Sequence, residues 1–127
     1  MPLTPTADIV AGAAKAGAGV GSFNVIQVEH AEAIAAGAEA AGAPVILQIS
    51  ENCVNYHGGL GAIGAAALAV AGASDAPVAV HLDHATDPRL AYEAVMESAS
   101  VIPVAGPTIA RGEGRSRDAT LRSLIPY

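Results

Sequence analysis

Alternating strand-like and helix-like segments over residues 1–98 predict an α/β fold built on a parallel sheet. Three short runs rich in apolar and β-branched residues, at 20–25, 44–50 and 77–83, predict strands. Segments rich in alanine separate these runs, and short links join each strand to the next helix. Strands and helices that alternate in this way pair in parallel with right-handed crossovers. We therefore expect three consecutive βα units.

Start and stop residues define the helices around these strands. Thr6 is the candidate N-cap of the first helix, and Gly42 follows the end of the second. Asp87 is the candidate cap of the last helix, with Pro88 at its first helical position, where the missing N–H is not needed. The predicted helices span residues 6–16, 28–41, 60–73 and 87–98.

Length and composition exclude several classes of protein. A chain of 127 residues is long enough for one domain but short for an α/β barrel, which needs about 250 residues. A net charge of −6 argues against nucleic acid as a partner. The single cysteine, Cys53, excludes an intrachain disulfide and fits a reducing compartment. The chain shows no signal peptide and no apolar run of about 20 residues, so we expect a cytoplasmic protein without a membrane partner.

Polar residues share one face of each predicted strand, near its C-terminal end. Alternate residues of a strand point to the same face. The pairs that share a face are Ser22 with Asn24, Gln48 with Ser50, and His81 with Asp83. Active sites of α/β barrels lie at the C-terminal ends of the strands. Polar residues that only satisfy one another at the end of a sheet are the alternative, but three strands in phase favour a functional site.

The segment from His81 to His84 offers two imidazoles and a carboxylate directly after an apolar run. These groups bind zinc and carry protons. Consecutive Asp83 and His84 both reach a site only where the strand ends and the chain turns. A catalytic zinc site needs three protein ligands. The remaining histidines have no ligand context, since we expect His30 on a solvated helix face and His57 in a surface loop.

These segments resemble the N-terminal third of the class II, metal-dependent fructose-bisphosphate aldolases and the related tagatose-bisphosphate aldolases. The similarity runs from about Pro2 to about Met96, and its order and spacing make it specific. It implies a (β/α)8 TIM barrel, of which this chain would hold about the first three βα units. The residues that carry it are Gly21–Val25, Ala43–Ser50 and Val78–His84, with the turn at Ser50–Asn52 and the loop at His57–Gly59.

The resemblance also implies a chemistry, namely reversible cleavage of a ketose bisphosphate with a zinc ion (Zn2+). The substrate would be fructose or tagatose 1,6-bisphosphate, and the products dihydroxyacetone phosphate and glyceraldehyde 3-phosphate. His84 matches a zinc ligand of the family, and Asp83 matches its catalytic acid/base. Asn24 and Ser50 match positions that contact the substrate. Homo-oligomers are implied for full-length members, and His81 receives no catalytic role.

The remaining candidate residues predict no chemistry of their own. No basic residue flanks Cys53 to lower the pKa of its thiol, so we expect an inert cysteine. Glu29, Glu32 and Glu39 recur along one predicted helix and are expected to form a solvated face rather than a metal cluster.

The composition changes near residue 98. Residues 1–98 hold ten acidic and two basic residues, a net charge of −8, whereas residues 99–127 hold two acidic and four basic residues, a net charge of +2. Prolines at 103, 107 and 126 add to the change. We expect residues 99–127 to be a divergent, poorly ordered tail in place of a fourth strand and helix. A change of reading frame is one hypothesis for its origin, and a genuine divergent tail is the other.

Two classes of function remain open. One is a class II aldolase by descent, truncated and inactive unless the rest of the barrel is supplied. The other is a non-catalytic fragment or interaction module derived from a barrel. A different barrel enzyme that uses Asp83 and His84 with a metal is a minor third reading. Zinc binding by the purified chain separates the first two classes.

Overall fold

The computed structural model of the chain describes residues 3–97, so the predicted tail at 99–127 and its boundary lie outside the described residues. Within the described range, helices and strands alternate along the chain. The elements are α1 (Thr6–Lys15), β1 (Gly21–Asn24), α2 (Val28–Ala41), β2 (Val45–Ser50), α3 (Glu51–His57), α4 (Gly61–Ala73), β3 (Val78–Asp83) and α5 (Pro88–Glu97).

The three strands form one parallel sheet in the order β1-β2-β3, as the strand–helix alternation predicts. The register aligns Asn24 with Gln48, and Gln48 in turn with His81. It also aligns Ser50 with Asp83. Residues aligned across parallel strands point to the same face, so the polar residues of all three strands lie on one face of the sheet.

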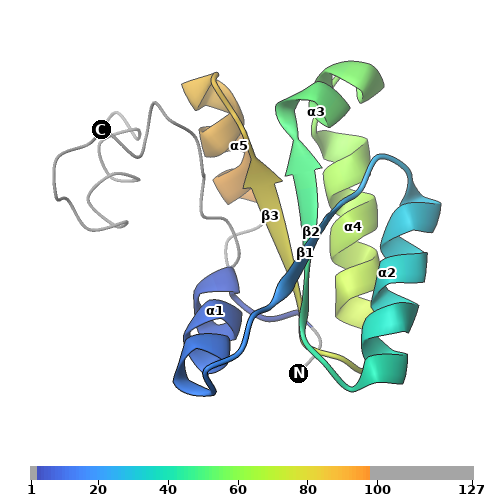
Figure 1. Cartoon of the computed structure of the whole chain (residues 1–127). Helices are drawn as coiled ribbons and strands as arrows, with labels where there is room; N and C mark the ends of the chain where they lie inside the picture. Colours follow the sequence, from blue (N-terminus) through green and yellow to red (C-terminus); the bar gives the residue numbers. More distant parts are fainter. Residues whose placement is uncertain (1–2, 98–127) are drawn as a thin grey trace, which may run out of the picture.

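The other face of the sheet forms the main core. In Figure 1, α2 and α4 lie on one side of the strands and α1 lies on the other, near their amino ends. Alanines of α2 and α4 belong to the same buried cluster as Leu47 and Leu82. Leu47 is 0% exposed and Leu82 is 2% exposed. Burial of each such side chain stabilises the fold by about 1.5–3 kcal/mol before packing effects.

The ends of two helices follow the predicted signals. Gly42 adopts the left-handed conformation, with φ of 59°, and ends α2 one residue after Ala41. At the start of α5, the Asp87 carboxylate accepts a hydrogen bond from the backbone N–H of Arg89 at 2.9 Å, so the predicted cap is confirmed.

The predicted cap of α1 is wrong. Pro5, with φ of −57° and ψ of 135°, is the N-cap, and Thr6 is already helical. The fixed φ of proline suits this boundary and removes a backbone donor that the helix does not use. The buried Thr6 hydroxyl finds no hydrogen-bond partner among the residues that the structure describes.

The short helix α3 was not predicted. It begins directly after β2, where the Ser50 hydroxyl accepts a hydrogen bond from the backbone N–H of Cys53 at 3.2 Å. It ends at Gly58, which has φ of 76°. His57 is therefore the last residue of a helix, and its predicted place in a loop is wrong, although the residue is exposed.

Between residues 3 and 97, no single helix is long and apolar enough to cross a membrane. Helices α3 and α4 reach the required length and composition only as a pair, and the chain bends by 115° between them.

Candidate active site

Three of the residues that the sequence singles out occupy the last positions of the three strands. Asn24 ends β1, Ser50 ends β2 and Asp83 ends β3. His84 follows directly after β3. Because the strands are parallel, their carboxyl ends meet at one edge of the sheet, which is where α/β proteins place their ligands.

A chain of hydrogen bonds joins the three strands at this edge. The Ser22 hydroxyl donates to Oε1 of Gln48, and Nε2 of Gln48 donates to Oδ2 of Asp83. The same carboxylate oxygen is hydrogen-bonded to Nδ1 of His84. Gln48 is thus the central member of the chain, because its amide joins β1 to β3. Its place on the polar face was visible in the sequence, but its two partners depend on the register between strands.

Asp83 and His84 differ in their exposure. The side chain of Asp83 is 11% exposed and that of His84 is 80% exposed. A buried carboxylate is stable only with polar partners, which Gln48 and His84 supply. The bond to Nδ1 occupies one ring nitrogen of His84 and leaves Nε2 directed away from this contact.

The backbone turns sharply at His84, which has φ of 53°. This left-handed conformation is uncommon outside glycine, although histidine tolerates it better than most residues do. Such residues cluster at functional sites, where the surrounding structure holds them in place. The turn carries the chain out of β3 and lets two consecutive side chains, Asp83 and His84, serve the same edge.

Ser50 and Asn24 differ in their exposure and in their hydrogen bonds. Asn24 is exposed, whereas Ser50 is half-buried and caps α3. In its capping bond the Ser50 hydroxyl accepts from the Cys53 N–H, so its own O–H remains able to donate. Both side chains are thus able to contact a ligand above the strand ends.

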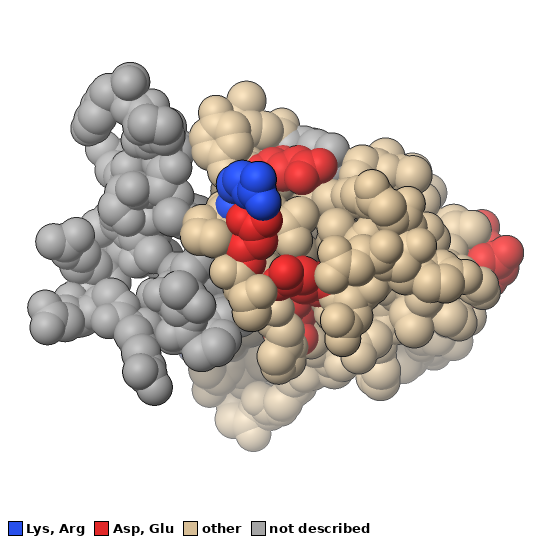
Figure 2. Space-filling view, turned by 90° about the horizontal axis from the view of Figure 1, so that it is seen from above, with Lys and Arg blue, Asp and Glu red and all other residues tan. Residues whose placement is uncertain are grey.

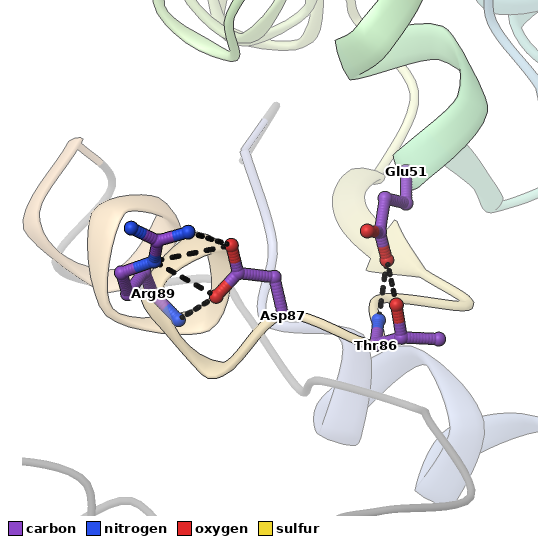
Figure 3. Close-up of polar contacts among 4 residues, drawn as sticks. All are labelled: Glu51, Thr86, Asp87 and Arg89. Atoms are coloured by element: carbon purple, nitrogen blue, oxygen red, sulfur yellow. Dashed lines mark hydrogen bonds and ion pairs between the residues drawn. The ribbon is translucent and has the colours of Figure 1, made fainter.

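The carboxylate of Glu51, at the start of α3, faces the loop that follows β3 (Figure 3). Its Oε2 accepts from the backbone N–H of Thr86 and from the Thr86 hydroxyl, the latter at 2.8 Å. These bonds lower the pKa of Glu51 below its ordinary value. Asp87, at the end of this loop, forms a separate ion pair at 2.9 Å with Arg89 of α5.

The face above the strand ends is acidic. Figure 2 shows acidic side chains gathered there, next to a basic group. Within residues 3–97 the basic residues are Lys15 and Arg89. Arg89 is paired with Asp87, and Lys15 ends α1, the helix near the amino ends of the strands. This part of the chain therefore supplies proton-handling groups but few groups that would bind phosphate.

Two other predicted residues have structural contacts. Nδ1 of His30 accepts hydrogen bonds from the backbone N–H groups of Ile26 and Gln27, both at 3.3 Å, at the start of α2. Cys53 is 3% exposed, and burial raises the pKa of its thiol, which agrees with an inert cysteine.

Glu39 is exposed, as predicted for the solvated face of its helix, but it also has a contact that was not predicted. Its carboxylate accepts from the Ser74 hydroxyl and from the Asp75 N–H, both at 2.8 Å, and these bonds lower its pKa. Helix α2 is thereby tied to the loop that leads into β3, a contact between distant segments that helical spacing does not reveal.

The described residues do not form a zinc site by themselves. No group of three His, Cys, Asp or Glu side chains within residues 3–97 is placed to hold a metal ion. The carboxyl edge offers His84 and the neighbouring Asp83, fewer than the three protein ligands that catalytic zinc requires.

A parallel α/β sheet with a buried carboxylate and an imidazole at its carboxyl edge is the layout of a ligand-binding α/β domain. Comparison with known families specifies which one. The sequence model described as fructose-bisphosphate aldolase class-II matches residues 4–104. The chain belongs to this family. The match extends to residue 104, a few residues beyond Met96, where the similarity seen in the sequence ends.

Curated relatives carry the names of more than one aldolase. The chain is 40% identical over 82 residues to the fructose-bisphosphate aldolase of Thermus caldophilus, a match that covers 65% of this chain and 25% of that protein. It is 37% identical over 86 residues to the 6-phospho-5-dehydro-2-deoxy-D-gluconate aldolase of Shouchella clausii (strain KSM-K16), covering 66% of this chain and 29% of that protein. The chain thus spans 25% of one relative and 29% of the other.

Solved structures show the same fold. The YdjI aldolase from Escherichia coli K12 superposes with a TM-score of 0.69 at 21% identity, over 76% of this chain and 37% of that one. A putative fructose-1,6-biphosphate aldolase from Coccidioides immitis superposes with a TM-score of 0.72 at 22% identity, over 93% of this chain and 42% of that one. At these identities the likeness establishes the fold alone.

Proposed function

We propose that this chain is the N-terminal part of a class II aldolase that cleaves a phosphorylated sugar reversibly. Asp83 is the observation that carries this proposal. It is a buried carboxylate at the end of β3, held by Gln48 and His84, in a chain that belongs to the aldolase family. Its place at the carboxyl edge is where a substrate would meet it.

The proposed architecture is a partial (β/α)8 barrel that contributes about the first three of its βα units. The parallel order β1-β2-β3, with a helix after each strand, supports this reading. In a barrel, further strands would pair with the outer edges of β1 and β3. The short match to the relatives, 25% and 29% of their lengths, agrees with a piece of that size.

The proposed role of Asp83 is proton transfer. Aldol cleavage breaks the carbon–carbon bond next to a hydroxyl group. The hydroxyl proton leaves as the aldehyde forms, and the electron pair of the broken bond passes to the carbon beside the ketone. A carboxylate within hydrogen-bond reach accepts that proton, and the carboxylic acid returns it in the condensation direction. Asn24 and Ser50 are proposed to contact the substrate beside it, since each offers a polar side chain at its own strand end.

Zinc is the cofactor that the family implies, and His84 is the ligand that we propose for it. At least two further ligands must come from outside the described residues, because residues 3–97 do not complete a metal site. We therefore expect the 127-residue chain alone to bind zinc weakly and to show no measurable aldol cleavage. The missing ligands account for both expectations.

The proposed substrate is fructose 1,6-bisphosphate or tagatose 1,6-bisphosphate. The names of the relatives cover a fructose-bisphosphate aldolase and an aldolase for a deoxygluconate phosphate, so all these candidates carry phosphate. Because Lys15 and Arg89 are the only Lys or Arg residues within residues 3–97, we propose that the phosphate sites lie outside this range. We further propose a cytoplasmic location, a homo-oligomeric complete protein, and no nucleic-acid partner in view of the net charge of −6.

A non-catalytic fragment is the second candidate, and exposed apolar side chains favour it. Phe23 on the outer strand β1 is 52% exposed, and Met96 on α5 is 66% exposed. Side chains of this kind are contact points for other protein segments when they gather into a patch.

A chimera tests the proposal. Residues 1–97 replace the matching part of the Thermus caldophilus aldolase, and cleavage of fructose 1,6-bisphosphate is measured with added zinc and with a chelator. We expect zinc-dependent cleavage by the chimera and none by the 127-residue chain. A folded chimera without activity would refute the proposed aldolase activity, and tight stoichiometric zinc binding by the 127-residue chain would contradict the expected lack of a complete zinc site in it.

A further inference from the structure

Helix α3 makes contact at both of its ends with loops that border the candidate site. At its first residue, the Glu51 carboxylate accepts two hydrogen bonds from Thr86, one from the backbone N–H and one from the hydroxyl. Thr86 lies two residues after His84. Figure 3 shows Glu51 on α3 directed at Thr86 in the loop between β3 and α5.

The other end of α3 has a matching contact. Nε2 of His57, the last residue of the helix, is hydrogen-bonded to the carbonyl oxygen of Ile26. The Sγ atom of Cys53 lies 3.9 Å from the same oxygen. Ile26 lies two residues after Asn24, in the loop between β1 and α2. Each contact thus falls two residues beyond a side chain of the candidate site.

We propose that α3 is a brace that positions both loops, with Glu51 holding the segment that carries His84 and His57 holding the segment that follows Asn24. Because α3 follows β2 directly, it connects the loops after β1 and β3 to the central strand of the sheet. The consequence for catalysis rests on the proposed aldolase function, whereas the holding of the loops does not.

The backbone of His84 explains why such a brace is needed. A histidine with φ of 53° stays in that conformation only when its surroundings fix it. Bonds to an ionised carboxylate are about twice as strong as those between neutral groups, so Glu51 is a firm anchor for Thr86. The lowered pKa of Glu51 agrees with a carboxylate that stays ionised in this contact. The charge of Asp87 opposes the ionised form, but it is the smallest of the effects on this pKa.

Amide hydrogen exchange in the full 127-residue chain tests the brace directly. We expect Glu51→Ala to speed exchange at the Thr86 N–H about tenfold or more, as the loss of one hydrogen bond predicts. Glu51→Gln keeps an acceptor oxygen and should restore part of the protection. His57→Ala should shift the amide signals of residues 25–28 and leave residue 86 unchanged. Glu32→Ala, an exposed change on α2, is the matched control and should alter neither loop.

Activity of the chimera tests the positioning role. We expect Glu51→Ala to lower kcat about tenfold to a hundredfold, because misplacement of a catalytic group by about 1 Å has effects of this size. The midpoint of thermal unfolding should fall slightly below that of the Glu32→Ala control, because two hydrogen bonds are lost, and Glu51→Gln should recover part of kcat. Unchanged exchange at Thr86 in Glu51→Ala overturns the brace. Faster exchange with unchanged kcat overturns the positioning role. If the unmutated chimera is inactive, the proposed function fails while the exchange result still decides the brace.

Discussion

The two ends of the sheet differ along a single face. At the amino ends of β2 and β3, this face carries Ile46 and Ala79, which are 5% and 0% exposed. At the carboxyl ends the same face carries Gln48 and Asp83, joined to each other by a hydrogen bond. Apolar burial at one end and a polar network at the other is the separation of stability from chemistry that barrel enzymes show.

Helix α1 accounts for the apolar end. It lies on the side of the sheet opposite α2 and α4, near the amino ends of the strands (Figure 1). Its residue Ile9 is 5% exposed and belongs to the same buried cluster as Ile46 and Ala79. The carboxyl half of the face instead bears partly exposed side chains, such as Gln48 and Ser50. Polar groups in that position bond to one another, to water or to a ligand.

The largest effect is expected at the polar end, from Asp83→Ala in the chimera. Removal of a general acid/base lowers kcat by about 10²- to 10⁴-fold. Steady-state kinetics on fructose 1,6-bisphosphate measure the change, and Asp8→Ala on the exposed part of α1 is the control. A chimera that keeps its kcat after Asp83→Ala would show that the carboxylate is only a structural partner of Gln48.

Substitutions in the apolar part of the sheet should lower the free energy of unfolding. Leu47 is 0% exposed, and Leu47→Ala is expected to lower the free energy of unfolding by about 2–5 kcal/mol. Its neighbour across the strands, Phe23, is 52% exposed, so Phe23→Ala should have a smaller effect. Urea unfolding of the 127-residue chain measures both. Equal losses for the two variants would mean that the outer strand is covered as well as the central one.

The sequence predicted most of this arrangement because its signals are local. The limits of α2 follow from Gly42, which adopts the left-handed conformation that ends the helix. The polar face follows from strand parity. Helix α3 escaped prediction because seven residues are too few to show a helical period, and its cap, Ser50, also ends a strand. The contacts of Gln48 and Glu51 could not be predicted from the sequence, because each joins residues about 26 to 35 positions apart.

A smaller effect is expected at the junction of β2 and α3. Ser50→Ala removes the capping acceptor of α3 and should lower the free energy of unfolding by about 1 kcal/mol. Ser50→Asp keeps an oxygen that accepts from the Cys53 N–H and should restore most of the loss. Urea unfolding again provides the measurement. If Ser50→Asp is as unstable as Ser50→Ala, the capping bond is not what stabilises this junction.

The smallest effect concerns the stability of the fold at acid pH, and it involves both ends of β3. Glu39 ties α2 to the loop that enters β3, and Glu51 ties α3 to the loop that leaves it. Hydrogen bonds lower the pKa of both carboxyls. The donors are Ser74 and then Asp75 for Glu39, and Thr86 for Glu51. Their stabilisation is therefore complete above the ordinary value of 4.5, where the folded and unfolded chains are both ionised.

Below that pH the unfolded chain takes up protons before the folded chain does, so the stabilisation is lost as the pH falls through the lowered pKa. We expect the free energy of unfolding to decrease with acid below pH 4.5, and the decrease to be shallower in Glu39→Gln and in Glu51→Gln. Urea titrations at several pH values test this, with Glu32→Gln as the control on the same helix as Glu39. A Glu39→Gln curve parallel to that of the unmodified chain would show that the charge of Glu39 contributes no pH-dependent stability at the entrance to β3. The same result for Glu51→Gln would show that the charge of Glu51 contributes no pH-dependent stability at the loop that follows β3 and carries His84.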